Sequence, residues 1–331
     1  MILYLLKMAA RRGRKLASAL ACIGLIGAGG ELPAMAPDSA QAGAPLTIGL
    51  VNFDASALPA NILAEGVRAK AKEAGWDVIV QDPKADLGQA NAICTQYVTR
   101  KVDAIIVHVF QISQMAQCLA YAKDASIPVY FMGSTLQEGV AGTVSLAVAS
   151  GVNKDFLTFA ATVPNLKVLA FTYRPGAPCL IREQDLDTQI AAGKLSLQVS
   201  KEEIRVPGIV TNALASTQAW LNGHPAGQKE NLAIWACTSD AAFGALTALK
   251  QVDRAGIPIY TFDMNEQIVD SLRAGEIAET LWIDPKGVGS QLVKQIQDHI
   301  AGGAPREDEA AHLAITKDNL EDFLKKHPDL N

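Results

Sequence analysis

Seven polar side chains stand at or shortly beyond the ends of apolar segments, and they are the residues best suited to binding chemistry. In open parallel sheets, ligands bind beyond the carboxyl ends of the strands, where such side chains meet. Amides, carboxylates, hydroxyls, an imidazole and a guanidinium can all exchange hydrogen bonds with a small polar ligand. The predicted ligand-binding residues are Asn52, Asp54, His108, Ser134, Arg182, Thr238 and Asp263.

Each charged candidate has a plainer alternative. Asp263 directly follows an apolar run, which favours a place in the cleft, whereas Asp54 could equally be a solvated loop acid. Arg182 could form a surface ion pair with Glu183 or Asp185, which would contribute little to stability. A lone histidine at a strand end, such as His108, is more often a hydrogen-bonding or space-filling residue than a catalyst.

Enzyme signatures are weak along the whole chain. The turn at 52–60 has no glycine-rich fingerprint, and there is no Walker loop and no G-x-S-x-G elbow. The cysteines show neither C-x-x-C nor metal-ligand spacing. We therefore expect no catalytic residue, no metal and no cofactor.

The first 42 residues read as a cleavable signal peptide. A positive region precedes the apolar stretch 16–30, and Ala40-Gln41-Ala42 is a cleavage pattern that places the mature start near Gly43. This predicts export to the periplasm. An uncleaved membrane anchor is the alternative, and Arg11-Arg12 leaves both the Sec and the twin-arginine route open.

Four of the five cysteines lie in the predicted mature chain, because Cys22 falls within the apolar stretch. In an oxidising compartment, Cys94 with Cys118 and Cys179 with Cys237 are possible disulfide pairs. Buried free thiols are the alternative.

Strands and helices alternate from residue 46 onward, as in open α/β sheets. Apolar runs predict the strands, and helical spacing predicts the helices between them. The pattern restarts near residue 167, so two successive units share one chain. The predicted strands are 46–51, 76–80, 102–109, 127–132, 143–148, 167–172, 204–206, 232–236, 257–262, 278–283 and 311–315.

The bulk composition limits the partners. Hydrophobic residues make up 49% of 331 residues, enough for two lobes with sizeable cores. The net charge is −5 and no basic stripe is visible, which argues against a nucleic-acid partner. We expect a monomer.

Several stretches together resemble one known family. They are Thr47-Ile48-Gly49-Leu50-Val51 with Gly66 and Gly75, Val102 to Val107, Ala125-Ser126-Ile127-Pro128-Val129, Asp240 to Leu246, and Tyr260-Thr261-Phe262-Asp263. Over 46–331 the chain resembles the ribose-binding-like periplasmic sugar-binding proteins of ABC transporters. The resemblance implies two doubly wound parallel-sheet α/β lobes joined by a three-crossing hinge. It implies an N-terminal lobe of 43–148 and 284–308 and a C-terminal lobe of 149–283 and 309–331, with crossings near 147–151, 263–265 and 283–285.

The resemblance also implies roles for single residues. Asp263 matches the aspartate that binds sugar hydroxyls, and Arg182 matches the arginine after the first C-lobe strand. His108 falls at a polar N-lobe contact, and Thr238 falls where the family often has asparagine. This chain departs from the family at three places. Leu58-Pro59-Ala60-Asn61 stands where the family has stacking aromatic residues in the first loop, and Gly133-Ser134 stands where it has an Asp-Arg pair. The family's glutamine at the last crossing is also replaced, near Ile283. An ordinary stacked pentose or hexose is therefore not expected.

The expected function is capture of a small polar, sugar-like ligand for an ABC-transporter permease, by hinge closure. A sensor that presents the ligand to a membrane receptor or kinase is one alternative. A secreted enzyme on the same fold is another.

Overall fold

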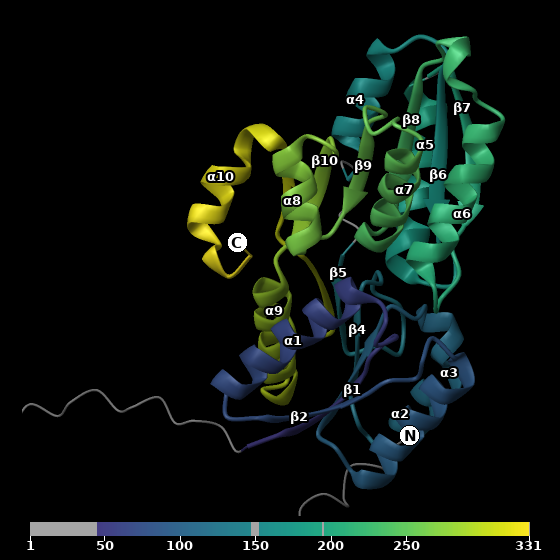
Figure 1. The fold of residues 1–331 in the computed structure, drawn as a ribbon. Coiled ribbons are helices and arrows are strands. Elements are labelled where there is room, and N and C mark those ends of the chain that lie inside the picture. The colour runs from purple at the N-terminus through teal and green to yellow at the C-terminus, as the bar shows by residue number, and fades with distance from the viewer. Residues whose placement is uncertain (1–44, 147–151, 194, 331) are drawn as a thin grey trace, which may run out of the picture. The chain divides into compact units, whose positions relative to one another are not determined.

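The strands of the protein form two sheets of six strands each (Figure 1). The computed structural model describes residues 45–146, 152–193 and 195–330. The predicted signal peptide and Cys22 lie outside these residues. All described residues belong to one compact unit, and the two predicted α/β lobes are confirmed.

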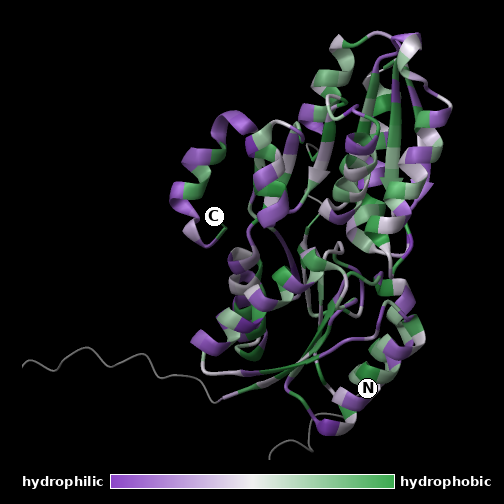
Figure 2. Ribbon diagram, in the orientation of Figure 1, coloured by the Kyte–Doolittle hydropathy of each residue, from purple (hydrophilic) through white to green (hydrophobic). Residues whose placement is uncertain are grey.

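The first sheet has the order β11-β5-β4-β3-β1-β2, and every neighbouring pair in it is parallel. The central strands are mostly apolar, as expected for a sheet with helices on both faces. Hydrophobic residues accordingly concentrate in the strands (Figure 2). The strands are β1 (Thr47–Val51), β2 (Asp77–Gln81), β3 (Ala104–His108), β4 (Val129–Met132), β5 (Gly142–Ser145) and β11 (Arg306–Glu309).

Helices α1 (Leu58–Glu73) and α9 (Pro285–Ile300) pack against one face of this sheet and against each other. Their backbones touch at two glycines. A Cβ atom added to Gly66 would lie 2.1 Å from the Pro285 carbonyl oxygen, and one added to Gly289 would lie 2.3 Å from the Gly66 carbonyl oxygen. Larger residues at these two positions would push the helices apart.

Helix α2 (Leu87–Arg100) covers the opposite face with α3 (Ala116–Asp124), which follows the short helix η1 (Ile112–Met115). The Tyr97 ring fills the space beside Gly49, where a Cβ would come within 2.5 Å of the ring. The Tyr97 hydroxyl donates a hydrogen bond to the Ile79 carbonyl oxygen at 2.8 Å. The Cys94–Cys118 disulfide joins α2 to α3.

The second sheet has the order β12-β10-β9-β8-β6-β7, with β12 antiparallel to β10 and the other pairs parallel. Its strands are β6 (Leu166–Thr172), β7 (Leu197–Glu203), β8 (Leu232–Ala236), β9 (Ile259–Phe262), β10 (Glu279–Ile283) and β12 (His312–Ile315). Its α-helices are α4 (Lys154–Thr162), α5 (Ala177–Gly193), α6 (Ile209–Asn222), α7 (Ser239–Gln251), α8 (Glu266–Ala274) and α10 (Lys317–Lys326). Two short helices are also present: η2 (Ala226–Gln228) between α6 and β8, and η3 (Pro328–Leu330) after α10. The predicted strand at 204–206 is wrong, because the hydrogen-bonded strand beside β6 is Leu197–Glu203.

The chain passes between the sheets three times: between β5 and β6, between β10 and β11, and between β11 and β12. The first passage contains 147–151, outside the described residues. The second lies at Asp284 and the third at 310–311. The crossing predicted near 263–265 is wrong, because β9 and β10 are parallel neighbours in one sheet and α8 only connects them.

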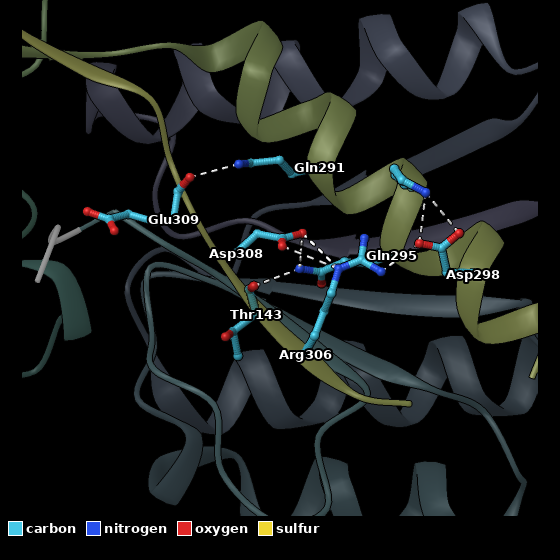
Figure 3. A network of polar contacts seen from close by, with 8 residues as sticks. Thr143, Gln291, Gln295, Asp298, Arg306, Asp308 and Glu309 are labelled. Atoms are coloured by element: carbon cyan, nitrogen blue, oxygen red, sulfur yellow. Dashed lines mark hydrogen bonds and ion pairs between the residues drawn. The ribbon is translucent and has the colours of Figure 1, made fainter. Parts of the chain in front are cut away.

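A polar network holds β11 on the edge of the first sheet (Figure 3). The Gln295 amide donates to the Thr143 carbonyl oxygen at 2.8 Å and to the Asp308 carboxylate at 2.9 Å. Arg306 lies 2.6 Å from Asp298 and 3.1 Å from Asp308. Because β11 leads directly into 310–311, the network fixes one end of the third crossing.

No helix among the described residues is both long and apolar enough to cross a bilayer.

We predict that Gln295→Leu lowers the free energy of unfolding by about 1–3 kcal/mol, since it leaves buried polar partners without a donor. Urea unfolding measures this change. The matched control is Gln297→Leu, at an exposed position of the same helix, which should change stability little. Equal effects of the two substitutions would show that the network does not hold β11.

Candidate functional site

A cavity of about 70 Å³ lies where carboxyl ends of strands from both sheets meet. Residues that follow β1, β3, β6, β8 and β9 contribute to its lining, together with the first turns of α1 and α5. This is where parallel sheets place their ligands. Four predicted site residues line it: His108, Arg182, Thr238 and Asp263.

The centre of the polar lining is the buried Arg182 guanidinium. Its Nη1 donates to the Cys237 carbonyl oxygen at 2.7 Å, and its Nη2 donates to the Leu146 carbonyl oxygen at 3.1 Å. Its carbon Cζ lies 4.3 Å from the centroid of the Phe262 ring. The guanidinium therefore joins the end of β8 to the segment after β5, which belong to different sheets. The predicted alternative, a surface ion pair with Glu183 or Asp185, does not occur, because Arg182 is only 3% exposed and faces Asp263.

Asp263 faces Arg182, with 3.8 Å between Oδ2 and Nη1. Burial raises the pKa of Asp263 above its ordinary value, and the charge of Arg182 opposes that shift. At 3.8 Å the pair is an ion pair without a close hydrogen bond, so the carboxylate oxygens keep acceptor capacity for another donor.

Two residues beside the cavity have left-handed backbone conformations that non-glycine residues seldom adopt. They are Val109, directly after β3, and Asp263, directly after β9, each with a φ of 72°. Asp263 is held in place by its own N–H, which donates to the Leu281 carbonyl oxygen at 2.9 Å, and by the Thr280 hydroxyl, which donates to the Asp263 carbonyl oxygen at 2.6 Å. Strained backbone of this kind is often found at binding sites.

His108 and Thr238 add uncharged polar groups. His108 is buried, and burial lowers its pKa to about 3, so its imidazole is neutral at physiological pH. Its Nδ1 lies 3.5 Å from the Asn52 Oδ1. Thr238 stands before α7, and its hydroxyl makes no capping bond to that helix.

The other three predicted site residues do not line the cavity. Asn52 donates to the Asn61 Oδ1 at 2.8 Å and lies behind His108. Asp54 accepts from the Ser56 N–H at 2.7 Å and from the Ser56 hydroxyl. Ser134 is buried, and its hydroxyl has no hydrogen-bond partner among the described residues. A bond to helix α1 thus accounts for Asn52, and bonds within its own turn account for Asp54.

Most of the remaining lining is apolar, and none of it belongs to the predicted ligand-binding residues. Phe53 and Tyr173 meet edge to face, with 5.7 Å between ring centroids. The other apolar lining residues include Ala57, Ala60, Leu63, Pro178, Ile204, Val206 and Ile209. Apolar residues near helix starts and in short connecting segments carry no signal in the sequence that would identify them as part of a binding site.

Backbone contacts join the two sides of the cavity. The Ala177 N–H donates to the Val109 carbonyl oxygen at 2.8 Å, and Phe110 forms an antiparallel bridge with Gly176. Gly133 has a φ of 102°, and a Cβ there would lie 2.6 Å from the Pro178 ring. Pro178 therefore packs closely against the position where the resemblance implies an Asp-Arg pair.

The second disulfide, Cys179–Cys237, is part of the cavity wall. It joins the first turn of α5 to the residue that follows β8. Arg182 lies one turn further along α5 and donates to the carbonyl of the same Cys237. Both cysteine pairs that the sequence left open are thus disulfides, which excludes free thiols at these positions.

The family described as "Periplasmic binding protein domain" matches residues 48–304 of this chain. The ribose import binding protein RbsB of Bacillus subtilis is 23% identical over 257 residues, which are 76% of this chain and 81% of that protein.

Solved structures share the fold. An ABC transporter solute-binding protein from Agrobacterium vitis with bound allitol has a TM-score of 0.77 at 21% identity, and the match covers 85% of this chain and 99% of that one. An ABC transporter solute-binding protein from Bacillus halodurans with bound myo-inositol has a TM-score of 0.73 at 19% identity, with 85% and 98% covered. Both likenesses are evidence of the two-lobed fold.

One prediction concerns Asp240 in the first turn of α7. Burial and, to a smaller extent, the nearby charge of Asp263 together raise its pKa to about 6, and a hydrogen bond from the Leu58 N–H opposes the shift. Because the pKa in the folded protein exceeds the ordinary value of 3.8, the contribution of this carboxyl to stability is complete below pH 3.8 and is lost as the pH rises through 6. Asp240→Asn should therefore gain stability relative to the unmodified protein between pH 4 and 8, by up to about 3 kcal/mol.

Urea unfolding at pH 4, 6 and 8 measures this difference. The matched control is Asp124→Asn, at an exposed position of α3, for which we expect a constant offset across the pH range. A constant offset for Asp240→Asn as well would contradict the prediction.

Proposed function

Because the chain belongs to the periplasmic binding protein family, we propose that it captures a small neutral solute of the sugar or polyol class in the periplasm and delivers it to an ABC-transporter permease. The observation that carries this proposal is the cavity between the two sheets, where Arg182 and Asp263 meet. The names of the relatives, which mention ribose, allitol and myo-inositol, agree with hydroxylated solutes.

Binding in this scheme needs no covalent step. Asp263 accepts hydrogen bonds from ligand hydroxyls, and Arg182 keeps the carboxylate in place without using all its lone pairs. Thr238 and His108 offer further hydrogen bonds from the C-terminal and N-terminal lobes, respectively. A ligand that touches both lobes favours the arrangement in which they meet.

The size of the cavity supports a hinge mechanism. Its volume of about 70 Å³ is well below the ~300–1,000 Å³ that small-molecule sites usually have. A solute of sugar size therefore enters when the lobes separate. The crossings at Asp284 and 310–311 are short enough to act as the hinge.

Export by a cleaved signal peptide and action as a monomer complete the proposal. A periplasmic location suits two disulfides, which persist in oxidising compartments.

Two measurements test the function. A thermal-shift screen of pentoses, hexoses, polyols and sugar acids identifies solutes that raise the melting temperature by mass action. Uptake of the best of these, labelled, is then compared in cells with and without the gene. Loss of uptake supports transport, whereas unchanged uptake with loss of a transcriptional response to the solute would instead support the sensor.

We predict that Asp263→Ala weakens binding of the best solute about ten- to hundredfold, because a charge-assisted hydrogen bond is lost. Titration calorimetry measures the affinity. The matched control is Asp54→Ala, which removes a carboxylate outside the cavity lining and should leave affinity unchanged. Unchanged affinity in folded Asp263→Ala protein would remove Asp263 from the site.

The two disulfides give a second matched comparison. They close sequence separations of 24 and 58 residues, so removal of either should cost a similar ~3.5–4.2 kcal/mol of stability in the chain-entropy account. Only removal of Cys179–Cys237 should also weaken solute binding, because this disulfide fixes the helix turn that carries Arg182.

The variants are Cys179→Ser with Cys237→Ser, and Cys94→Ser with Cys118→Ser. Calorimetry at a temperature where both are folded separates affinity from stability. Equal affinities in the two variants would show that Arg182 is positioned without the disulfide.

A further inference from the structure

We propose that a latch beside the cavity holds the two lobes together in the empty protein, and that this latch competes with the solute. The latch consists of residues 109–111, which follow β3 of the first sheet, and residues 174–177, which lead from β6 of the second sheet into α5. The expected effect on affinity rests on the proposed function, whereas the latch itself can be tested without a solute.

The main chains of the two segments pair in antiparallel order. The Ala177 N–H donates to the Val109 carbonyl oxygen at 2.8 Å, and the next residue along the chain, Phe110, forms a bridge with Gly176. This pairing lies outside both sheets and joins one lobe to the other.

A side chain extends the pairing by one further contact. The Gln111 Nε2 donates to the Arg174 carbonyl oxygen at 2.7 Å. Gln111 does not line the cavity, so this bond connects the lobes without being part of the wall that a solute would touch.

The close approach of the two segments depends on Gly176. A Cβ atom added there would lie 2.9 Å from the Val109 Cγ1 and 2.8 Å from the Tyr173 ring. Val109 itself has a left-handed backbone, with a φ of 72°. Such a conformation persists where surrounding contacts hold it, and the bond from Ala177 is one of them.

The latched arrangement leaves little room for a solute. Phe53 of one lobe meets Tyr173 of the other with 5.7 Å between ring centroids, and Pro178 packs closely against Gly133. The cavity keeps about 70 Å³, against the ~300–1,000 Å³ of ordinary small-molecule sites. A bound solute therefore holds the lobes at a wider spacing, where they meet through the solute and the latch contacts are broken.

Mutual exclusion lowers the apparent affinity, because only the unlatched fraction of the protein binds the solute. One hydrogen bond of ordinary net strength changes the ratio of latched to unlatched protein about two- to tenfold. Loss of one latch contact should therefore raise the affinity by up to this factor. If the latch instead formed around the bound solute, the same loss would lower the affinity.

Gly176→Ala tests the latch in the absence of any solute. The added methyl group separates the two segments, so the solute-free variant should have a larger radius of gyration than the unmodified protein. The matched control is Gly256→Ala, at an exposed glycine where an added Cβ meets no atom within 4 Å. Small-angle X-ray scattering should give the control and the unmodified protein the same radius of gyration.

Gln111→Glu tests the competition with the solute without altering the cavity wall. It removes the amide that donates to Arg174 and keeps an oxygen that can cap the short helix η1. Titration calorimetry with D-ribose, allitol and myo-inositol should show about two- to tenfold tighter binding to this variant than to the unmodified protein.

Equal radii of gyration for the three solute-free proteins would overturn the latch. Unchanged or weaker binding to Gln111→Glu would overturn its competition with the solute, and both results would leave the proposed function standing. If none of the three probes binds and cells show no gene-dependent uptake, the proposed function fails, whereas scattering still decides whether the latch exists.

Discussion

The buried guanidinium of Arg182 is the constraint on which the candidate site depends. A charge that is only 3% exposed must be compensated by hydrogen bonds and by an opposite charge. Arg182 obtains them from two carbonyl oxygens, from Asp263 and from the face of the Phe262 ring. One of those carbonyls, that of Leu146, lies next to the first sheet. Satisfying this one side chain thus requires both lobes to be in contact, which links the site to the arrangement of the lobes.

The first turns of α5 gather these constraints in a short stretch of chain. Pro178 packs against Gly133, Cys179 forms a disulfide, and Arg182 follows at helical spacing on the same helix. At the first position of the helix, the Ala177 N–H donates to the Val109 carbonyl oxygen after β3. A lysine in place of Arg182 could not bridge two carbonyls with a planar fork. The turn is therefore an interface between the lobes as well as a wall of the cavity.

The framework was predictable because buried parallel strands are continuous apolar runs, and those runs predict β3, β8 and β9 from the sequence alone. The helices α2 and α4 were not predicted. The helical spacing of Ala90, Ile93, Cys94 and Tyr97 was available in the sequence, but polar residues between them obscured it. The misplaced crossing near 263–265 has a similar cause: the loop after β9 resembles a lobe boundary, and the partner of β10 is a matter of pairing that local pattern does not reveal.

Whether a predicted site residue lines the cavity depends on its place relative to the strand end and on the contacts available to its side chain. Residues directly at strand ends, His108 and Asp263, reached the cavity because the sheet geometry places them there. Asn52 and Asp54 follow β1 as closely, but Asn52 bonds to Asn61 on helix α1, and Asp54 bonds to Ser56 in its own turn. Tyr173 also reached the cavity from a strand end, directly after β6, whereas Val206 lies beyond the end of β7 and no local pattern identifies it as part of the wall.

The 3.8 Å between Arg182 and Asp263 leaves the carboxylate able to accept a hydrogen bond from a ligand. A close bidentate pair would use one acceptor site on each oxygen of the Asp263 carboxylate and leave fewer sites for a solute. At 3.8 Å, with burial raising its pKa, the carboxylate is desolvated but incompletely hydrogen-bonded. Bringing the lobes together therefore costs desolvation that Arg182 offsets only in part. A hydroxyl that donates to Asp263 supplies the missing hydrogen bond, so the bound solute itself stabilises the arrangement in which the lobes meet.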